Sequence, residues 1–214
     1  MNIKKLKQAE ESFMDRYPLG FDTPEIQAIS KKHRMDKIVA FTKDNFTLSA
    51  LENVDDAIEN SIRLVQRSTM VSLFEKPKFR DGLRSMGLDE RTFFIESLKQ
   101  LLHGDEELGF HQMLDIFINY GLAKWTLITV FRCYYYPETD LLYKPTTVKN
   151  VIKYFEIENL IYKPRPSYDF FIRYRDIIND MKKEVNPMVT GIYNAGFSGF
   201  LMMAMQMAAE EDEV

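Results

Sequence analysis

The sequence predicts an all-α protein, a compact bundle-like domain of about nine or ten helices. Apolar side chains recur every three or four residues along most of the chain, which is the spacing of one face of an α-helix. The 214 residues include only nine glycines and eight prolines, and a β-rich chain of this length would need more turn-forming residues. A hydrophobic fraction of 45% with 28% charged residues is typical of a folded globular protein.

In the first half of the chain, the clearest helix is predicted over residues 49–67. Its apolar stripe advances in steps of three and four residues: Leu51, Val54, Ile58, Ile62 and Val65. Thr23 is the expected N-cap of a helix that begins at Pro24, and Asp89 is the expected cap of a helix that ends at Gly104. Further helices are predicted over residues 2–17, 36–46 and 105–120.

Residues 69–89 interrupt this periodicity and predict a hinge or a boundary between subdomains. Pro77, Gly82 and Gly87 fall within the segment and weaken any helical pattern. A short strand over residues 71–74 is left open there, as is another over residues 158–162.

In the second half, residues 123–136 predict a central buried helix, because they are apolar on almost every side. A helix starts at Pro145 and runs to Phe155, and Ser167 caps a long helix that ends near Val185. The intervening residues 162–167 are expected to be extended, since each of two prolines disfavours helix in the residue before it. A last helix spans residues 194–209, and its four methionines are interpreted as core, with a partner-binding face as the open alternative.

The expected organisation is a helical subdomain over residues 1–75 packed on a helical core over residues 76–209, with an acidic tail over residues 210–214. A single domain and two subdomains both fit the length. Removing Glu210, Glu211, Asp212 and Glu213 leaves 28 basic and 28 acidic residues. The body is therefore neutral, without the overall positive charge common in nucleic-acid-binding proteins.

The chain's only cysteine, Cys133, has no internal disulfide partner, which is typical of a reducing compartment. The first residues lack the apolar core of a signal peptide, and no apolar run approaches the roughly 20 residues that span a bilayer. We therefore expect a cytoplasmic protein with no membrane partner. An adjacent Arg132 could lower the pKa of the thiol, but neighbours on a helix point about 100° apart, so Cys133 is interpreted as buried core.

Glu107, His111 and Asp115 form the weak candidate for a metal site. They lie four residues apart and would share one face of a helix. Helical di-iron sites instead use Glu-x-x-His, repeated on a second helix, and neither the spacing nor the repeat is present. A solvated polar face is the preferred interpretation, and we expect no cofactor. His33 and His103 both fit helix ends, so no residue is predicted to be catalytic, although an enzyme remains an open alternative.

Residues 144–183 carry the strongest functional signal, with nine basic residues against five acidic ones. Tyr162, Tyr168 and Tyr174 lie among them, a combination that suits phosphate contact and base stacking. The predicted nucleic-acid face comprises Lys144, Lys149, Lys163, Arg165, Arg173 and Arg175. An ordinary solvated helix surface is the competing interpretation.

The last ninety or so residues resemble a group of bacterial all-helical proteins of unassigned activity. The resemblance rests on Lys124-Trp125, Lys144-Pro145-Thr146, Tyr162-x-Pro164 and Ser198-x-Phe200-Leu201, in this order. Some similar regions are associated with modification-dependent restriction systems, so the resemblance implies a role near DNA defence. The ending Gly199-Phe200-Leu201 is less bulky than the pattern of the group.

These observations favour a non-enzymatic interaction or accessory protein of a bacterial or phage multi-protein assembly. A nucleic-acid-associated accessory protein that uses the basic residues of 144–183 is the alternative, and a metal-dependent helical enzyme is a distant one. A protein partner is expected, and self-association into a homo-oligomer is left open.

Overall fold

The computed structural model describes residues 1–212 and confirms the predicted all-α fold, with no β-strand in those residues. Among the helices described, none has the length and apolar composition needed to cross a bilayer. The elements are α1 (Ile3–Arg16), η1 (Gly20–Asp22), α2 (Pro24–His33), α3 (Met35–Asn45), α4 (Val54–Arg67), α5 (Glu75–Ser85), α6 (Leu88–His103), α7 (Glu106–Asn119), α8 (Trp125–Tyr135), α9 (Pro145–Tyr154), α10 (Tyr168–Lys183), η2 (Pro187–Val189) and α11 (Asn194–Asp212).

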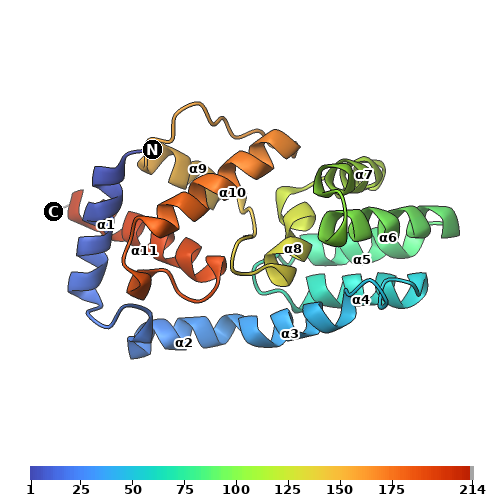
Figure 1. Ribbon diagram of the computed structural model, residues 1–214, viewed down its shortest axis with the longest axis horizontal. Helices are drawn as coiled ribbons and strands as arrows, with labels where there is room; N and C mark the ends of the chain where they lie inside the picture. Colours follow the sequence, from blue (N-terminus) through green and yellow to red (C-terminus); the bar gives the residue numbers. More distant parts are fainter. Residues whose placement is uncertain (213–214) are drawn as a thin grey trace.

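The helices form two groups that are joined along one edge (Figure 1). Helices α4 to α8 gather at one end, whereas α1, α9, α10 and α11 gather at the other. Helices α2 and α3 lie end to end along the lower edge of the view and run from one group to the other (Figure 1). Among the residues predicted as an N-terminal subdomain, α1 packs on α11, while α4 packs on α5, α6 and α8. One continuous cluster of buried apolar side chains extends through both groups.

Helix starts follow the capping rules that the sequence displays. The side chains of Asn2, Asn53 and Asp105 accept hydrogen bonds from backbone N–H groups in the first turns of α1, α4 and α7. Thr23 occupies the predicted N-cap of α2, yet its hydroxyl makes no capping bond. The N-cap of α6 is Gly87 rather than Asp89, since the helix begins at Leu88. The Glu90 carboxylate accepts a hydrogen bond from the Gly87 N–H at 2.9 Å.

Helix α5 lies inside the segment predicted as a hinge or a boundary between subdomains, where the sequence analysis predicted no helix. Pro77 is the third residue of the helix, where a missing N–H costs nothing because no helical partner exists for it. Gly82 is a packing residue, since a Cβ there would lie 2.9 Å from Cδ1 of Leu122. Neither open strand, over residues 71–74 or 158–162, is formed.

Helix α8 is the central buried helix, as predicted, and nine of its eleven residues are buried. The Trp125 ring packs on Tyr143 and Phe170 at centroid distances of 5.4 and 5.1 Å. Its indole N–H donates to the Lys163 carbonyl at 2.8 Å, which fixes the non-helical segment of residues 162–167 against the core. The predicted extended connection is therefore confirmed as a segment without helix and has a defined anchor.

Helix α11 closes the second group but is not uniformly buried. Met207 lies in the core, Met203 and Met205 are half-buried, and Met202 is exposed. The predicted acidic tail begins within this helix, where Glu210 pairs with Arg16 of α1 at 3.2 Å. Residues 213–214 of that tail lie outside the described part of the chain.

Helices α6 and α7 are in close backbone contact at Gly109, where a Cβ would lie 2.2 Å from the backbone nitrogen of Leu101. Because the clash is with backbone, Gly109→Ala must push the two helices apart, and we expect it to destabilise the fold by about 1–3 kcal/mol. The measurement is the midpoint of urea unfolding followed by circular dichroism. Gly199→Ala in α11 is the matched control, because a Cβ there meets nothing within 4 Å. An equal effect at both positions would contradict the packing argument.

Candidate functional site

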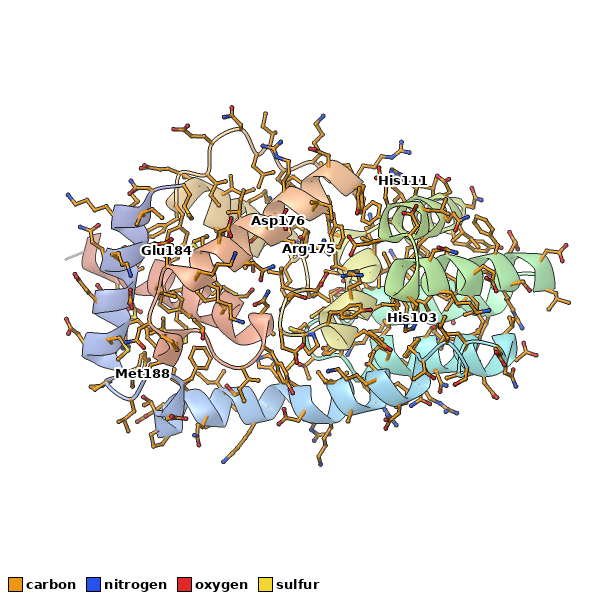
Figure 2. All side chains as sticks on the ribbon, viewed as in Figure 1. His103, His111, Arg175, Asp176, Glu184 and Met188 are labelled. Carbon is orange, nitrogen blue, oxygen red and sulfur yellow. The ribbon has the colours of Figure 1, made fainter. Side chains whose placement is uncertain are left out.

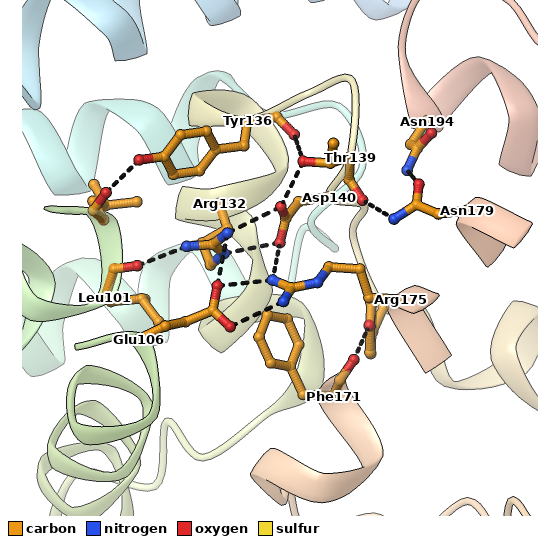
Figure 3. Close-up of polar contacts among 12 residues, drawn as sticks. Leu101, Glu106, Arg132, Tyr136, Thr139, Asp140, Phe171, Arg175, Asn179 and Asn194 are labelled. Carbon is orange, nitrogen blue, oxygen red and sulfur yellow. Dashed lines mark hydrogen bonds and ion pairs between the residues drawn. The ribbon is translucent and has the colours of Figure 1, made fainter. Parts of the chain in front are cut away.

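Four charged side chains meet at the junction of the two helix groups and form what we call the central ion-pair network (Figure 3). They come from four different segments: Glu106 from the start of α7, Arg132 from α8, Asp140 from the α8–α9 connection and Arg175 from α10. Asp140 is only 2% exposed, and the two arginine side chains are 12% and 16% exposed. The network is thus largely shielded from water.

Opposite charges alternate around the network, so that each acid lies between two arginines. Arg132 pairs with Asp140 at 2.8 Å and with Glu106 at 2.7 Å. Arg175 pairs with Glu106 at 2.8 Å and with Asp140 at 3.2 Å. Both arginines use two nitrogen atoms toward one carboxylate, the bidentate arrangement that makes guanidinium–carboxylate pairs strong.

Neighbouring groups satisfy the remaining hydrogen-bonding capacity of the network. Arg132 also donates to the Leu101 carbonyl at 2.8 Å, and the Thr139 hydroxyl donates to Asp140 at 3.1 Å. The Tyr168 hydroxyl donates to Glu106 at 3.0 Å, and burial together with the charge of Glu106 raises the pKa of Tyr168 to about 12. The network is therefore completed by neutral donors and a backbone acceptor.

Aromatic rings cover the two guanidinium groups. Arg132 lies over the Tyr136 ring at 4.7 Å and Arg175 over the Phe171 ring at 5.0 Å. Burial alone would lower the pKa of Arg175, but its hydrogen bonds and charge interactions with Glu106 and Asp140 raise it. Arg175 is therefore held as a cation, and the network suits a structural role rather than proton transfer.

A neutral polar cluster extends from this network to α11 (Figure 3). Asn179 donates to the Thr139 carbonyl at 2.9 Å and accepts from the Asn194 amide at 2.8 Å. Lys182 donates to the side-chain oxygen of Asn194 at 3.0 Å, and burial lowers its pKa. A shallow surface hollow beside the cluster is lined by Thr139, Asp176, Asn179, Asp180, Lys182 and Lys183.

The structure separates the residues of the sequence-predicted nucleic-acid face. Arg175 belongs to the central network, in the middle of the molecule (Figure 2). Arg173 is exposed, but it donates to the Asn159 carbonyl at 2.6 Å and pairs with Asp169 at 3.6 Å. Lys144 is half-buried at the start of α9, and burial together with the charge of Lys144 lowers the pKa of His33.

Three members of that predicted face remain exposed: Lys149, Lys163 and Arg165. The Lys149 amine lies 5.9 Å from the centroid of the Tyr162 ring. The predicted interleaved tyrosines do not form a stacking surface with them, because Tyr174 is buried and Tyr168 is bound to Glu106. What persists is a small exposed basic group around residues 149–165.

The weak metal candidate lies on an exposed face of α7, and His111 is at the edge of the molecule (Figure 2). Nε2 of His111 is 3.8 Å from the Glu107 carboxylate, a surface pair of residues four apart. Within the described residues, no group of three or more His, Cys, Asp or Glu side chains is arranged to hold a metal ion. Glu106, the residue before Glu107, points inward to the central ion-pair network.

His103 and Cys133 are both engaged in the fold. His103 shares a hydrogen bond of 2.7 Å with the Phe46 carbonyl and packs edge-on against Tyr135 at 5.1 Å. Cys133 is buried, and burial together with the charge of Asp140 raises the pKa of its thiol. Arg132 does not lower that pKa, because its guanidinium is paired with Asp140 and Glu106.

The turn before α5 presents two large apolar side chains to solvent, a feature that the sequence prediction missed. Leu73 is 80% exposed and Phe74 is 83% exposed. We call residues 72–75 the apolar turn. Two consecutive large apolar residues in a segment of weak periodicity were the available signal, but they were interpreted as part of an alternative strand.

Hydrogen bonds hold the apolar turn rigidly in place. The Glu75 carboxylate accepts from both the backbone N–H and the hydroxyl of Ser72, at 3.2 and 2.7 Å. Its second oxygen accepts from the Thr126 hydroxyl in the first turn of α8. The exposed pair is thus carried by a turn that is attached to the central helix.

The fold and these surfaces define an all-helical protein with a buried charged centre and separate apolar and basic surface groups. Comparison with protein-family models, curated proteins and solved structures finds no match.

Replacing one acid of the network leaves two buried cations with half of their pairing. We expect Asp140→Asn to lower the free energy of unfolding by about 3 kcal/mol or more. Asp180→Asn on α10 is the matched control, because its pair with Lys183 is exposed and should contribute little. Urea unfolding at neutral pH measures both. A loss at Asp140 no larger than the loss at Asp180 would show that the network does not stabilise the fold.

Because the Cys133 thiol is buried and its pKa is raised, it should react slowly with a thiol reagent such as DTNB in the native protein. In denaturant, one thiol per chain should react promptly. Absorbance at neutral pH measures both rates. Rapid labelling of the native protein would contradict the placement of this side chain.

Proposed function

We propose that the protein is a non-enzymatic accessory protein that binds a protein partner through the apolar turn. The observation that carries this proposal is the almost complete exposure of Leu73 and Phe74 on a turn fixed by three side-chain hydrogen bonds. Folding gains nothing from leaving two such side chains in water. A binding partner would gain the free energy of burying them.

The ordered backbone of the apolar turn favours binding through Leu73 and Phe74. A turn that is already ordered loses little conformational entropy on association. Aromatic side chains that enter a partner's pocket commonly dominate the energy of an interface. Phe74 is therefore the expected anchor, and Leu73 is the expected flanking contact.

The surroundings of the turn indicate the chemistry of the partner. Lys76, Lys78 and Arg80 follow within the first two turns of α5. Arg80 is already paired with Asp81 at 2.8 Å, whereas the described acids form no ion pair with Lys76 or Lys78. The matching surface is an apolar pocket bordered by acidic residues.

The resemblance of the last ninety residues supports the setting of this proposal. It implies a bacterial or phage assembly, such as a modification-dependent restriction system, with the protein acting inside the cell. In such an assembly the chain would be an accessory subunit. A second copy of the chain is a competing occupant of the apolar turn, and its oligomeric state in solution distinguishes the two.

A second candidate function is nucleic-acid association through the exposed group of Lys149, Lys163 and Arg165. The specific observation in its favour is that these three side chains are exposed and that Lys149 lies over the half-buried Tyr162 ring. It would use a surface that does not include the apolar turn.

The test compares Leu73→Ser/Phe74→Ser with the unaltered protein in affinity purification from the organism that encodes it, followed by mass spectrometry. The double variant should lose the partner and keep its melting temperature, because neither side chain packs in the core. Titration against the purified partner should then show binding at least about tenfold weaker, as expected when an aromatic anchor is removed.

Ile161→Ser/Ile192→Ser is the matched control, since both of these side chains are also strongly exposed, at 77% and 79%. This control should retain the partner. Equal capture by both double variants, or a partner-free monomer, would refute the proposal. Sedimentation of the protein with anionic vesicles, dependent on Phe74, would assign the turn to a membrane surface instead.

A further inference from the structure

Six basic side chains from three separate segments lie around the junction of α2 and α3, and we call them the basic joint. Four come from the junction itself, one from the end of α4 and one from the start of α9: Lys31, Lys32, Arg34, Lys37, Arg67 and Lys144. Residues 31–37 contain one acid, Asp36, against four of these bases.

Side-chain contacts bring the three segments together. The Arg67 guanidinium lies over the Phe41 ring at 4.5 Å, and Phe41 is one turn beyond Lys37 on the same face of α3. Nδ1 of His33 shares a hydrogen bond of 2.9 Å with Thr69, two residues after Arg67. His33 also experiences the charge of Lys144, which together with burial lowers its pKa.

A single left-handed residue separates α2 from α3 at the junction. Arg34 has a φ of 50°, a left-handed conformation that ends α2 and starts α3. Such a conformation is uncommon for a residue with a side chain. It lets α2 and α3 continue end to end (Figure 1), so that the basic residues of both helices stay near one point.

The bases of the basic joint have no acidic partners among the described residues, a property they share with Lys149, Lys163 and Arg165. Some arginines elsewhere do form ion pairs, such as the exposed Arg84 with Glu59 at 3.1 Å and the half-buried Arg91 with Asp55 at 3.4 Å. In the part of the chain that the structure describes, no carboxylate pairs with any base of the joint. Asp36 instead accepts a hydrogen bond from Tyr193 at 3.1 Å.

We propose that the basic joint is a binding site for the phosphate backbone of a nucleic acid. Five of its cations are exposed, and Lys144 is half-buried beside them. Unpaired positive charges that gather from several segments repel one another, and phosphates relieve that repulsion while releasing condensed counterions. If the Thr69 hydroxyl donates to Nδ1 of His33, then Nε2 carries the ring hydrogen and can donate to a phosphate oxygen.

A nucleic acid fits this surface better than a lipid bilayer does. Peripheral membrane helices present a row of exposed apolar side chains beside their basic ones. Along α2 and α3 the large apolar side chains are buried or half-buried except for Ile29. The site therefore offers charge without an apolar surface to insert, which suits backbone contact that is independent of sequence.

The basic joint shares Lys144 with the basic face predicted from residues 144–183, but its other residues come from a different part of the chain. The sequence-predicted face groups that residue with Lys149, Lys163 and Arg165, whereas in the structure the charge of Lys144 acts on His33 at the α2–α3 junction. The two locations can be separated by experiment. The apolar turn is not part of either, so failure of the nucleic-acid site would leave the protein-partner proposal unaffected.

The experiment measures fluorescence anisotropy of labelled duplex and single-stranded DNA of about 20 nucleotides, at several salt concentrations. Arg34→Gln/Lys37→Gln/Arg67→Gln removes three charges from the basic joint. We expect affinity at low salt to fall by about tenfold or more, and the slope of log K against log salt to decrease by about two to three.

Lys149→Gln/Lys163→Gln/Arg165→Gln is the matched control, because it removes the same charge from the competing face. Its affinity should stay within about twofold of that of the unaltered protein. If the control loses binding while the joint variant keeps it, the site is at residues 149–165 and this inference is wrong. No binding of either DNA at low salt would also overturn it, as would tighter binding to anionic vesicles than to DNA.

Circular dichroism and thermal melting must show that each variant is folded. Should the joint triple variant unfold through loss of the Arg67–Phe41 contact, Lys37→Gln carries the test alone. The Lys37 side chain is exposed and pairs with no described carboxylate, so its replacement should weaken binding severalfold without changing the melting temperature. Unchanged affinity in a folded Lys37→Gln protein would count against the site.

Discussion

The alternating contacts of Glu106, Arg132, Asp140 and Arg175 are the interaction on which the rest of this structure depends. They connect α7, α8, α10 and the α8–α9 connection at one point. Taking four charges out of water is costly, and the attraction between them offsets that cost only when the geometry is good and the remaining donors are satisfied. Here Tyr168, Thr139 and the Leu101 carbonyl complete the hydrogen bonds. A network of this kind tolerates few alternative arrangements of the helices that carry it.

The same network explains why basic residues close in sequence do not form one surface. Arg175 faces inward to Glu106 and Asp140, whereas Arg173, two residues earlier on α10, is exposed. Successive helical positions differ by about 100°, so one residue of a basic stretch can face the core while another faces solvent. Meanwhile the charge of Lys144 acts on His33 of α2, which lies outside that basic stretch. Counting charges along the chain therefore measures their number but not their grouping in space.

Much of the fold could be predicted from local patterns, whereas the charged centre could not. Capping residues and apolar stripes are local, so the positions of α4, α7 and α8 follow from the sequence within a few residues. Helix α5 was missed because Pro77 and Gly82 were interpreted as breaks, although one lies in the first turn and the other faces Leu122. The network joins residues as far apart as Glu106 and Arg175. No periodicity relates such positions, and the metal hypothesis at Glu107 selected the neighbour of the residue that matters.

The stability of the fold accounts for the central ion-pair network but not for the apolar turn or the basic joint. Folding accounts for the buried charges, since each has a partner that offsets its desolvation. It does not account for an exposed Phe74, nor for six cations gathered without a described acid. Both features also require specific local structure, the Ser72–Glu75 hydrogen bonds in one case and the left-handed Arg34 in the other. In both places the exposed side chains are therefore held on ordered backbone, and preorganisation of this kind lowers the entropy lost on binding.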